Sequence, residues 1–437
     1  MSYSLNNLKE WDDKIVSLAK NHNLDWFDLD FEVIDYHEMI GAMVHHGMPS
    51  MYSHWSFGKS FEQTMNRYNV GIEGLPYELI INSDPSLAYL MRENPLYLQI
   101  LIMAHCVGHS DFFKNNRMFK NTQPQSVIQR LRSAKKRIQK YVEDPHIGIT
   151  VVERTIDACQ ALQFQTTKYG QIRRSHAEIK AEYVEMINND KDGKYKSFNL
   201  DLFPLEADYD LLGFIETNAD IPSWKRDIIH VCREEGQYFW PQIQTKIMNE
   251  GWASFWHYTL CHELNLPDEL HLPVIKMHNA VVRPHIGAIN PYHLGFYLFQ
   301  KIKERYGIDE CFLAREACYD TSFLRQYLTE EDCMELNLFT FSSKKKEGLT
   351  VDDVSDEKGW KQVKEDLIKT VAGGSIPIIY VDEVKKENLN LLVVRHEHDG
   401  RDLELKHAQE VVDHIKYLWQ QPVKFYTIIE EEPWEID

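Results

Sequence analysis

The sequence has no long apolar run, no signal-like start and no excess of positive charge. No stretch approaches the roughly 20 apolar residues that span a bilayer. The opening MSYSLNNLKEWDDK does not show the basic and then apolar pattern of a secretion signal. The formal net charge is −19, so the average surface repels nucleic-acid phosphates and anionic lipids. We therefore expect neither nucleic acid nor a membrane as a partner.

Paired cysteines are also absent, because the seven cysteines form no C-x-x-C motif. They are Cys106, Cys159, Cys232, Cys261, Cys311, Cys318 and Cys333. An odd number without a paired pattern is typical of free thiols in a reducing compartment. No Gly-rich phosphate loop occurs either, since VAGGSIP lacks the lysine and the helical context. The sequence predicts a cytoplasmic protein.

The 437 residues exceed the usual size of one hydrophobic core, so we expect several packed parts. The predicted fold class is α+β and predominantly helical, with a small α+β domain at the C-terminus. The expected divisions are an N-terminal helical region (1–165), a polar linker or lid (166–208), a second helical region (209–305) and the C-terminal domain (306–437). Within the last, Asp399-Gly400 predicts a hairpin turn between two strands.

One predicted strand leads into a predicted buried helix. YELIINS, bounded by prolines, has the short β-branched pattern of a strand. The following SLAYLMRENPLYLQILIMAHCVGH has a helical period and is apolar nearly all round, which predicts a buried helix. His105 and His109 lie at the end of this run, four residues apart and therefore on one face of a helix.

This H-x-x-x-H spacing is that of a zinc-binding H-E-x-x-H helix, but Cys106 stands where the glutamate base would be. Three interpretations stay open: a metal site, a metal site without its usual base, or two core histidines. A pairing of Cys106 with His109 as nucleophile and base is a further alternative, although the two side chains lie about 60° apart around the helix.

A third metal ligand is available on a later helix. Glu250 in KIMNEGWASFWH is a carboxylate among aromatic and apolar residues, and burying it without a partner is costly. Its Asn-Glu-x-x-Ala-Ser context is similar to the helix that supplies the third ligand in many zinc peptidases. We therefore expect a zincin-like helical core that holds a divalent metal, zinc foremost, through His105, His109 and Glu250. His257 is expected as a fourth ligand or as a residue that orients a ligand.

The catalytic base is the missing part of this hypothesis, because a cysteine replaces it only as a stabilised thiolate. Acidic candidates from elsewhere in the chain are Glu38, Glu62, Glu234 and Glu235. Candidates for stabilising an oxyanion are His278 and Tyr292.

Four further residues are candidates for binding substrate: His54, Lys59, Arg283 and Asn290. The structural alternative is that their aromatic neighbours belong to the core and that Asn290-Pro291 is a turn that begins a helix.

Several long motifs are similar in order to those of one family. They are HWSFGKSFE, YELIINSDPSLAYLMRENP, MAHCVGHSDFFKNN, WKRDIIHVCREEGQYFWPQIQTKIMNEGWASFWH, VVRPHIGAINPYHLG, DTSFLRQYLTEEDCMELNLF and YLWQQPV. The chain resembles the SpoVR family, stage V sporulation protein R, over nearly its whole length. The His-rich DYHEMIGAMVHHGMP departs from the usual family pattern and leaves open a more polar pocket wall.

The resemblance implies a cytoplasmic bacterial protein that takes part in forming the spore cortex. It also implies an accessory role beside a serine kinase with an AAA+ domain and a protein with a von Willebrand A-like fold. Two hypotheses follow: a metal-dependent hydrolase of amide bonds in a peptide or peptidoglycan precursor, and a non-catalytic interaction protein. A direct hydrogen bond between His105 and Glu250 would favour the second.

Overall fold

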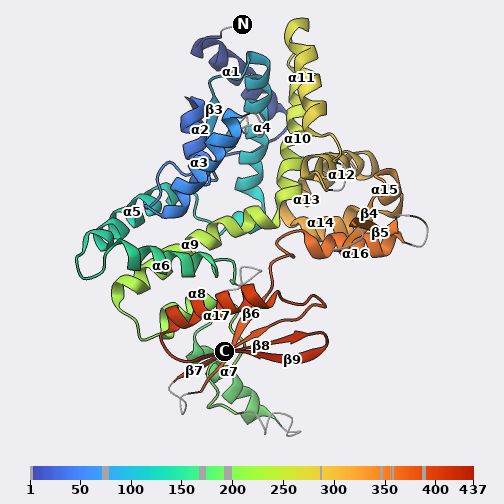
Figure 1. Cartoon of the computed structure of the whole chain (residues 1–437). Helices are drawn as coiled ribbons and strands as arrows, with labels where there is room; N and C mark the ends of the chain where they lie inside the picture. Colours follow the sequence, from blue (N-terminus) through green and yellow to red (C-terminus); the bar gives the residue numbers. More distant parts are fainter. Residues whose placement is uncertain are drawn as a thin grey trace. The chain divides into compact units, whose positions relative to one another are not determined.

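The computed structural model describes residues 3–70, 78–166, 174–190, 199–285, 288–344, 348–354, 356, 359–385 and 390–437. It divides into two compact units, each assembled from two separate segments of the chain. The first unit combines residues 1–135 with 241–375, and the second combines 136–240 with 376–437. Both units are predominantly helical with small sheets, as predicted for an α+β protein (Figure 1).

The first unit contains most of the helices. Its helices and one 3-10 turn are α1 (Leu5–Asn21), α2 (Tyr36–Val44), α3 (Trp55–Asn69), α4 (Leu96–Asn115), η1 (Arg117–Phe119), the first half of α5 (Val127–Glu143), α10 (Lys246–Glu263), α11 (Asp268–Val281), α12 (Pro291–Tyr306), α13 (Ile308–Ala317), α14 (Asp320–Tyr327), α15 (Glu330–Glu335) and α16 (Trp360–Thr370). Its strands are β1 (Leu29–Ile34), β2 (Glu78–Ile80), β3 (Ser86–Met91), β4 (Phe339–Lys344) and β5 (Gly348–Val354).

A three-stranded sheet with the order β1-β3-β2 precedes α4 in this unit. β1 runs parallel to β3, and β2 runs antiparallel to it along the other side. The prediction of a strand in YELIINS is confirmed for Glu78–Ile80 alone, because Ile81–Ser83 are not in a strand and Tyr77 lies outside the described residues. The helical prediction for Ser86–Met91 is wrong, because these residues are the central strand and the helix begins only after Pro95.

The predicted buried helix is confirmed as α4. Sixteen consecutive residues of this helix, Leu98 through Phe113, are buried. A helix that is apolar all round must be covered on every side, and α4 packs against α1, α10, α11 and α13. His105 and His109 are therefore held in a rigid interior rather than on a surface helix.

Close helix crossings hold α10 between α4 and α12 (Figure 1). A Cβ atom on Gly108 of α4 would lie 2.7 Å from the Cα of Ala253 on α10. At the other crossing, a Cβ on Gly251 would lie 2.4 Å from the Cα of Gly295 on α12. Only glycine permits these backbone approaches. The two contacts fix the position of α10, and with it the position of Glu250.

The second unit contains the rest of α5 together with α6 (Ile149–Gln160), α7 (His176–Asn189), α8 (Leu211–Asn218) and most of α9 (Ser223–Gln244). It also contains a four-stranded sheet with the order β6-β7-β8-β9. These strands are β6 (Ile379–Lys385), β7 (Leu391–His396), β8 (Val423–Ile429) and β9 (Glu432–Ile436), with α17 (Leu405–Trp419) between β7 and β8.

The hairpin predicted at Asp399-Gly400 is wrong. β7 ends at His396, the chain continues into α17, and β8 then pairs with β7 in parallel, so the turn opens a crossover connection. The expected boundary at residue 306 also differs from the structure, since α13–α16 belong to the first unit. Part of the predicted linker, 167–173 and 191–198, lies outside the described residues, and α7 lies between these two segments. None of the described helices is long and apolar enough to span a bilayer.

Candidate metal centre

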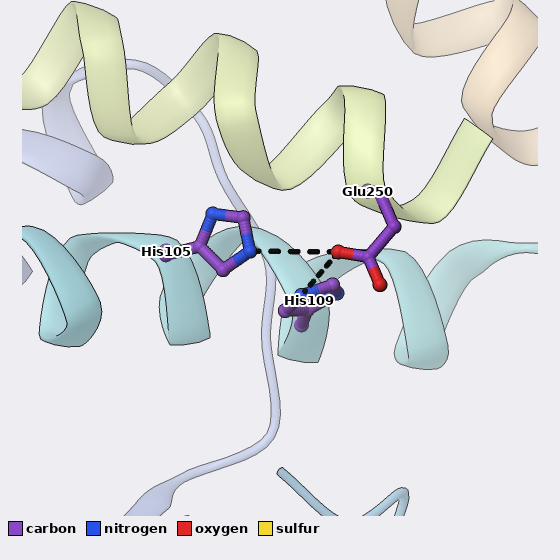
Figure 2. Close-up of side chains that lie close together, drawn as sticks. All are labelled: His105, His109 and Glu250. Carbon is purple, nitrogen blue, oxygen red and sulfur yellow. Dashed lines mark ion pairs between the residues drawn. The ribbon is translucent and has the colours of Figure 1, made fainter. Parts of the chain in front are cut away.

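Two helices bring His105, His109 and Glu250 together in the first unit (Figure 2). α4 presents the two imidazoles from adjacent turns, and α10 presents the carboxylate from the facing side. Glu250 Oε2 lies 3.6 Å from His105 Nε2 and 3.4 Å from His109 Nε2. One oxygen therefore faces one nitrogen of each ring. In the described part of the chain, this is the one group of three possible ligands whose ligand atoms all lie within 4.8 Å of one another.

The opposite nitrogens of both rings are held by other side chains. His109 Nδ1 lies 2.9 Å from the amide oxygen of Asn249, so this nitrogen carries the proton and donates it. His105 Nδ1 lies 2.8 Å from His257 Nδ1, and His257 Nε2 lies 2.7 Å from His278 Nδ1. A proton on His105 Nδ1 and one on His257 Nε2 satisfy both contacts, so His105 and His109 in their neutral forms each direct an Nε2 lone pair at Glu250.

The cluster contains buried polar atoms without partners. His105 Nε2 and Glu250 Oε2 have no hydrogen-bond partner among the described residues, and their 3.6 Å separation is longer than a hydrogen bond. Ligand atoms about 2.1 Å from a tetrahedral ion lie about 3.4 Å from one another, close to the two measured separations. Two imidazole nitrogens and a carboxylate oxygen are also donors that zinc binds well. The residues therefore fit a divalent metal.

The electrostatics of the cluster keep its carboxylate ionised. Burial alone would raise the pKa of Glu250, but the charge of His109 and the contacts with both imidazoles outweigh burial and lower it. Burial alone would lower the pKa of His109, but the charge of Glu250 raises it. Burial lowers the pKa of His257 well below its ordinary value and that of His278 to about 4. The two outer histidines are thus neutral near pH 7, as a chain of imidazole hydrogen bonds requires.

Two further side chains border the cluster, Glu78 and Tyr292. Glu78 Oε1, from strand β2, lies 4.0 Å from His105 Nε2, and burial raises the pKa of this carboxyl. The ring of Tyr292 stacks on that of His105, with centroids 6.1 Å apart. The charge of Glu250 and burial raise the pKa of the Tyr292 hydroxyl. This hydroxyl therefore stays protonated and can donate a hydrogen bond.

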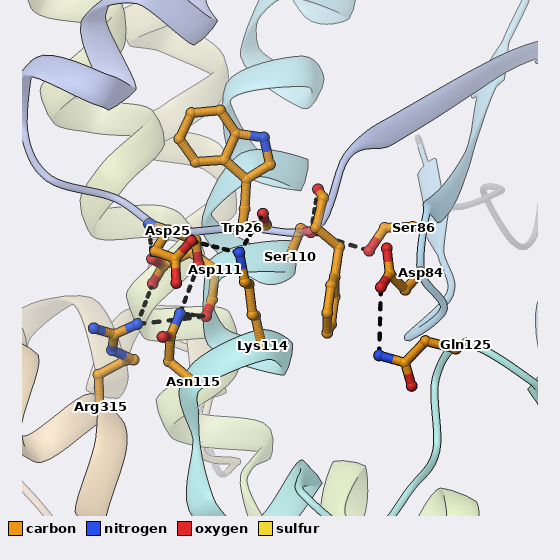
Figure 3. Close-up of polar contacts among 11 residues, drawn as sticks. Asp25, Trp26, Asp84, Ser86, Ser110, Asp111, Lys114, Asn115, Gln125 and Arg315 are labelled. Carbon is orange, nitrogen blue, oxygen red and sulfur yellow. Dashed lines mark hydrogen bonds and ion pairs between the residues drawn. The ribbon is translucent and has the colours of Figure 1, made fainter.

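Contacts at the C-terminal half of α4 fix the histidine helix in place (Figure 3). The fully buried Asp111 accepts hydrogen bonds from the backbone N–H of Asp25 at 2.8 Å, Trp252 Nε1 at 2.8 Å and Arg315 Nη1 at 3.0 Å. Because Trp252 lies on α10, this carboxylate ties both ligand-bearing helices to the N-terminal segment and to α13.

The first turn of α10 is capped from another helix. Thr245 makes no side-chain capping bond, and the carboxylate of Asp320 on α14 instead accepts from the backbone N–H groups of Ile247 and Met248, both at 2.9 Å. Burial raises the pKa of Asp320 to about 7. This cap fixes the turn that carries Glu250.

The structure places the other candidates as follows. His278 and His257 form the imidazole chain behind His105, so both nitrogens of His257 contact other rings and neither faces Glu250. His54 caps α3, accepting from the backbone N–H of Ser56 at 3.4 Å. Asn290 caps α12, as the structural alternative predicted, and its amide donates to the carbonyls of Val281 and Arg283.

Charged candidates lie outside the cluster. Lys59, Glu62 and Arg283 are exposed side chains of the first unit. Glu38 accepts from the backbone N–H of Asp35 in the capping box of α2. The last two, Glu234 and Glu235, belong to α9 in the second unit.

Two residues that border the cluster, Asn249 and Glu78, were not predicted from the sequence. Asn249 was visible only as the neighbour of Glu250, although its amide orients His109. Glu78 carried a signal, because it is the one charged residue in an otherwise apolar strand.

Comparison with known proteins identifies the family. The SpoVR like protein family matches residues 2–376, and the SpoVR-like C-terminal domain matches residues 377–430. The chain belongs to the SpoVR family. It is 32% identical over 457 residues to the Uncharacterized protein YcgB of Escherichia coli (strain K12), covering 93% of this chain and 89% of that relative. No solved structure matches. The junction of the two SpoVR matches falls where the second segment of the second unit begins.

Proposed function

We propose that this SpoVR-family protein is a metal-dependent hydrolase that cleaves an amide bond of a peptide or peptidoglycan precursor. The observation that carries the proposal is the pair of buried atoms, His105 Nε2 and Glu250 Oε2, which face each other without a hydrogen-bond partner among the described residues. Buried polar atoms are costly when left unpaired. Zinc held by His105, His109 and Glu250 would satisfy them, polarise an amide carbonyl and acidify water.

The order of the elements supports a zincin-like core as part of this proposal. An antiparallel side strand, β2, is followed by the central strand β3, then by the H-x-x-x-H helix α4, and later by α10 with the third ligand. Within the described sheet, β2 pairs only with β3. An extended peptide could therefore add to β2 as a further strand beside the histidines.

The side chains around the cluster have matching roles in the proposal. Tyr292 donates its hydroxyl proton in a hydrogen bond to the oxygen of the amide carbonyl as negative charge develops there. Asn249 and His257 hold the two ligand imidazoles in the orientation that a metal requires. The Glu78 and Glu250 side chains are 19% and 18% exposed, while Glu250 Oε2 and His105 Nε2 themselves are buried.

The cellular setting is proposed from the family. A role in sporulation, a cytoplasmic location, and work beside an AAA+ serine kinase and a von Willebrand A-like protein are all part of this proposal. The seven free and buried cysteines support a reducing compartment.

The test is metal content, measured by plasma mass spectrometry on protein purified without a histidine tag. Wild type should contain about one equivalent of zinc, manganese or iron. His105→Ala and Glu250→Ala should each lose the metal, whereas His407→Ala, which removes a 77% exposed histidine, should retain it. A wild-type protein that binds none of these ions after incubation would contradict the proposal of a metal-dependent hydrolase. The non-catalytic interaction protein would then be the better explanation of the cluster.

A further inference from the structure

The helix that carries the histidines supplies no base for hydrolysis. Cys106, at the position of the usual glutamate, is fully buried in the hydrophobic core. It also lies about 100° around the helix from His105. Because thiol chemistry requires a thiolate and the surroundings are apolar, this side chain cannot take up a proton from water. A base for the proposed hydrolysis must come from another element.

Strand β2 places a carboxylate at the cluster. Glu78 pairs with Leu90 and Ile80 pairs with Ala88 in the antiparallel register. Side chains alternate between the two faces of a strand, and directly paired residues share a face. Glu78 therefore lies on the same face as Leu90 and Ala88, both of which are completely buried in the core that contains α4. A charged side chain in that position needs an explanation.

The position of Glu78 differs from that of the ligand carboxylate. Its Oε1 lies 4.0 Å from His105 Nε2, while Glu250 Oε2 lies 3.6 Å from the same nitrogen. Glu78 is not part of the group whose ligand atoms all lie within 4.8 Å of one another. It is thus beside the centre and outside the ligand set, at a distance that one water molecule can bridge. The ion-pair partners described for the two glutamates are histidines only, so neither carboxylate is neutralised by a lysine or arginine there.

We propose that Glu78 is the carboxylate that accepts the proton of the attacking water in this hydrolysis. The inference rests on the proposed function. The water oxygen forms a bond to the amide carbonyl carbon while one water proton passes to Glu78. The C–N bond then breaks, and the same proton passes to the leaving nitrogen, so that water and amide give a carboxylic acid and an amine. The strand on which the peptide pairs would also supply the base, which keeps the scissile bond and the carboxylate in one register.

The test separates a base from a metal ligand without needing the natural substrate. Zinc affinity and the binding of acetohydroxamic acid to the zinc-loaded full-length protein are measured by calorimetry. A hydroxamate binds zinc through its oxygens, and a nearby carboxylate strengthens that binding by accepting the hydroxyl proton in a charge-assisted hydrogen bond. The variants are Glu78→Gln, Glu78→Asp and Glu250→Gln. The control is Glu32→Gln, an exposed glutamate on β1 of the same sheet.

Glu78→Gln should bind zinc within about threefold of wild type and acetohydroxamic acid at least tenfold more weakly. Glu78→Asp keeps the charge but withdraws it by one methylene group, so its affinity for acetohydroxamic acid should lie between those of wild type and Glu78→Gln. Glu250→Gln should lose zinc, and Glu32→Gln should match wild type in both measurements.

Three results would overturn the assignment. Equal acetohydroxamic acid binding by Glu78→Gln would mean that its carboxylate does not face the reacting water. A zinc loss in Glu78→Gln as large as in Glu250→Gln would make Glu78 a ligand. Zinc-loaded wild type that binds no acetohydroxamic acid would exclude a free position for water. Failure of wild type to bind zinc, by contrast, would refute the proposed metal function itself.

Discussion

The crossing of α4 and α10 at Gly108 provides a sharp test of how the fold builds the centre. Replacing Gly108 with alanine puts a Cβ atom 2.7 Å from the Cα of Ala253 and 3.3 Å from its Cβ. Carbon atoms prefer separations of about 3.5–4.0 Å, so the two helices must move apart by roughly 1 Å. The obstruction is backbone, which no rotamer change can remove.

Two effects of opposite sign determine the stability of Gly108→Ala. Overpacking of this kind costs about 1–3 kcal/mol. Alanine is better than glycine inside a helix by about 0.5–1 kcal/mol, which offsets part of that cost. We expect the free energy of unfolding in urea to fall by about 1–2 kcal/mol.

The same displacement should weaken metal binding much more strongly than it weakens the fold. α4 carries both histidines and α10 carries Glu250, so a separation of roughly 1 Å exceeds the ±0.2 Å tolerance of metal–ligand distances. Zinc affinity, measured by competition with a chelating dye, should fall by at least tenfold.

Two controls accompany this prediction. Gly58→Ala in α3, where a Cβ meets nothing within 4 Å, should gain about 0.5–1 kcal/mol and leave zinc binding unchanged. The double variant Gly108→Ala/Ala253→Gly should not recover, because the closest contact is to Cα. If Gly108→Ala has the same stability and zinc affinity as wild type, the close crossing of α4 and α10 does not control the metal centre.

Three further predictions concern burial. The pKa of Asp320 is about 7 in the folded protein, so the unfolded chain releases this proton near pH 4 and the folded protein only near pH 7. Titration of Asp320 therefore lowers the free energy of unfolding by on the order of 2–4 kcal/mol as the pH rises from about 4 to about 7. Asp320→Asn should make the free energy of unfolding depend less on pH over this range, as measured by urea titrations at several pH values. Arg315→Met should cost about 3–5 kcal/mol by chemical denaturation because it leaves the buried Asp111 unpaired, whereas Arg401→Met at an exposed pair should cost under about 1 kcal/mol; equal losses would contradict this. All seven cysteines are buried and free, so Ellman's reagent should label none within minutes in the native protein and seven in guanidinium, and a fast-reacting native thiol would count against an inert Cys106.

The parts of the fold that local pattern controls could be predicted from the sequence. The apolar run before His105 required a buried helix, and Asn290-Pro291 began a helix as expected, since capping and period are properties of adjacent residues. Ser86–Met91 was different. Its apolar residues fit a helix equally well, and only pairing with β1 and β2 makes it a strand.

The sequence by itself determined which chemical groups are available: two histidines on one helical face, a carboxylate in an aromatic helix, and no glutamate after the first histidine. The tertiary structure decided how these groups meet. It set the imidazole chain through His257, the approach of α10 at Gly108 and the placement of Glu78. It also built each compact unit from two distant segments. The physical reason is that periodicity and capping act over a few residues, whereas contacts between residues more than a hundred positions apart depend on packing that no local pattern encodes.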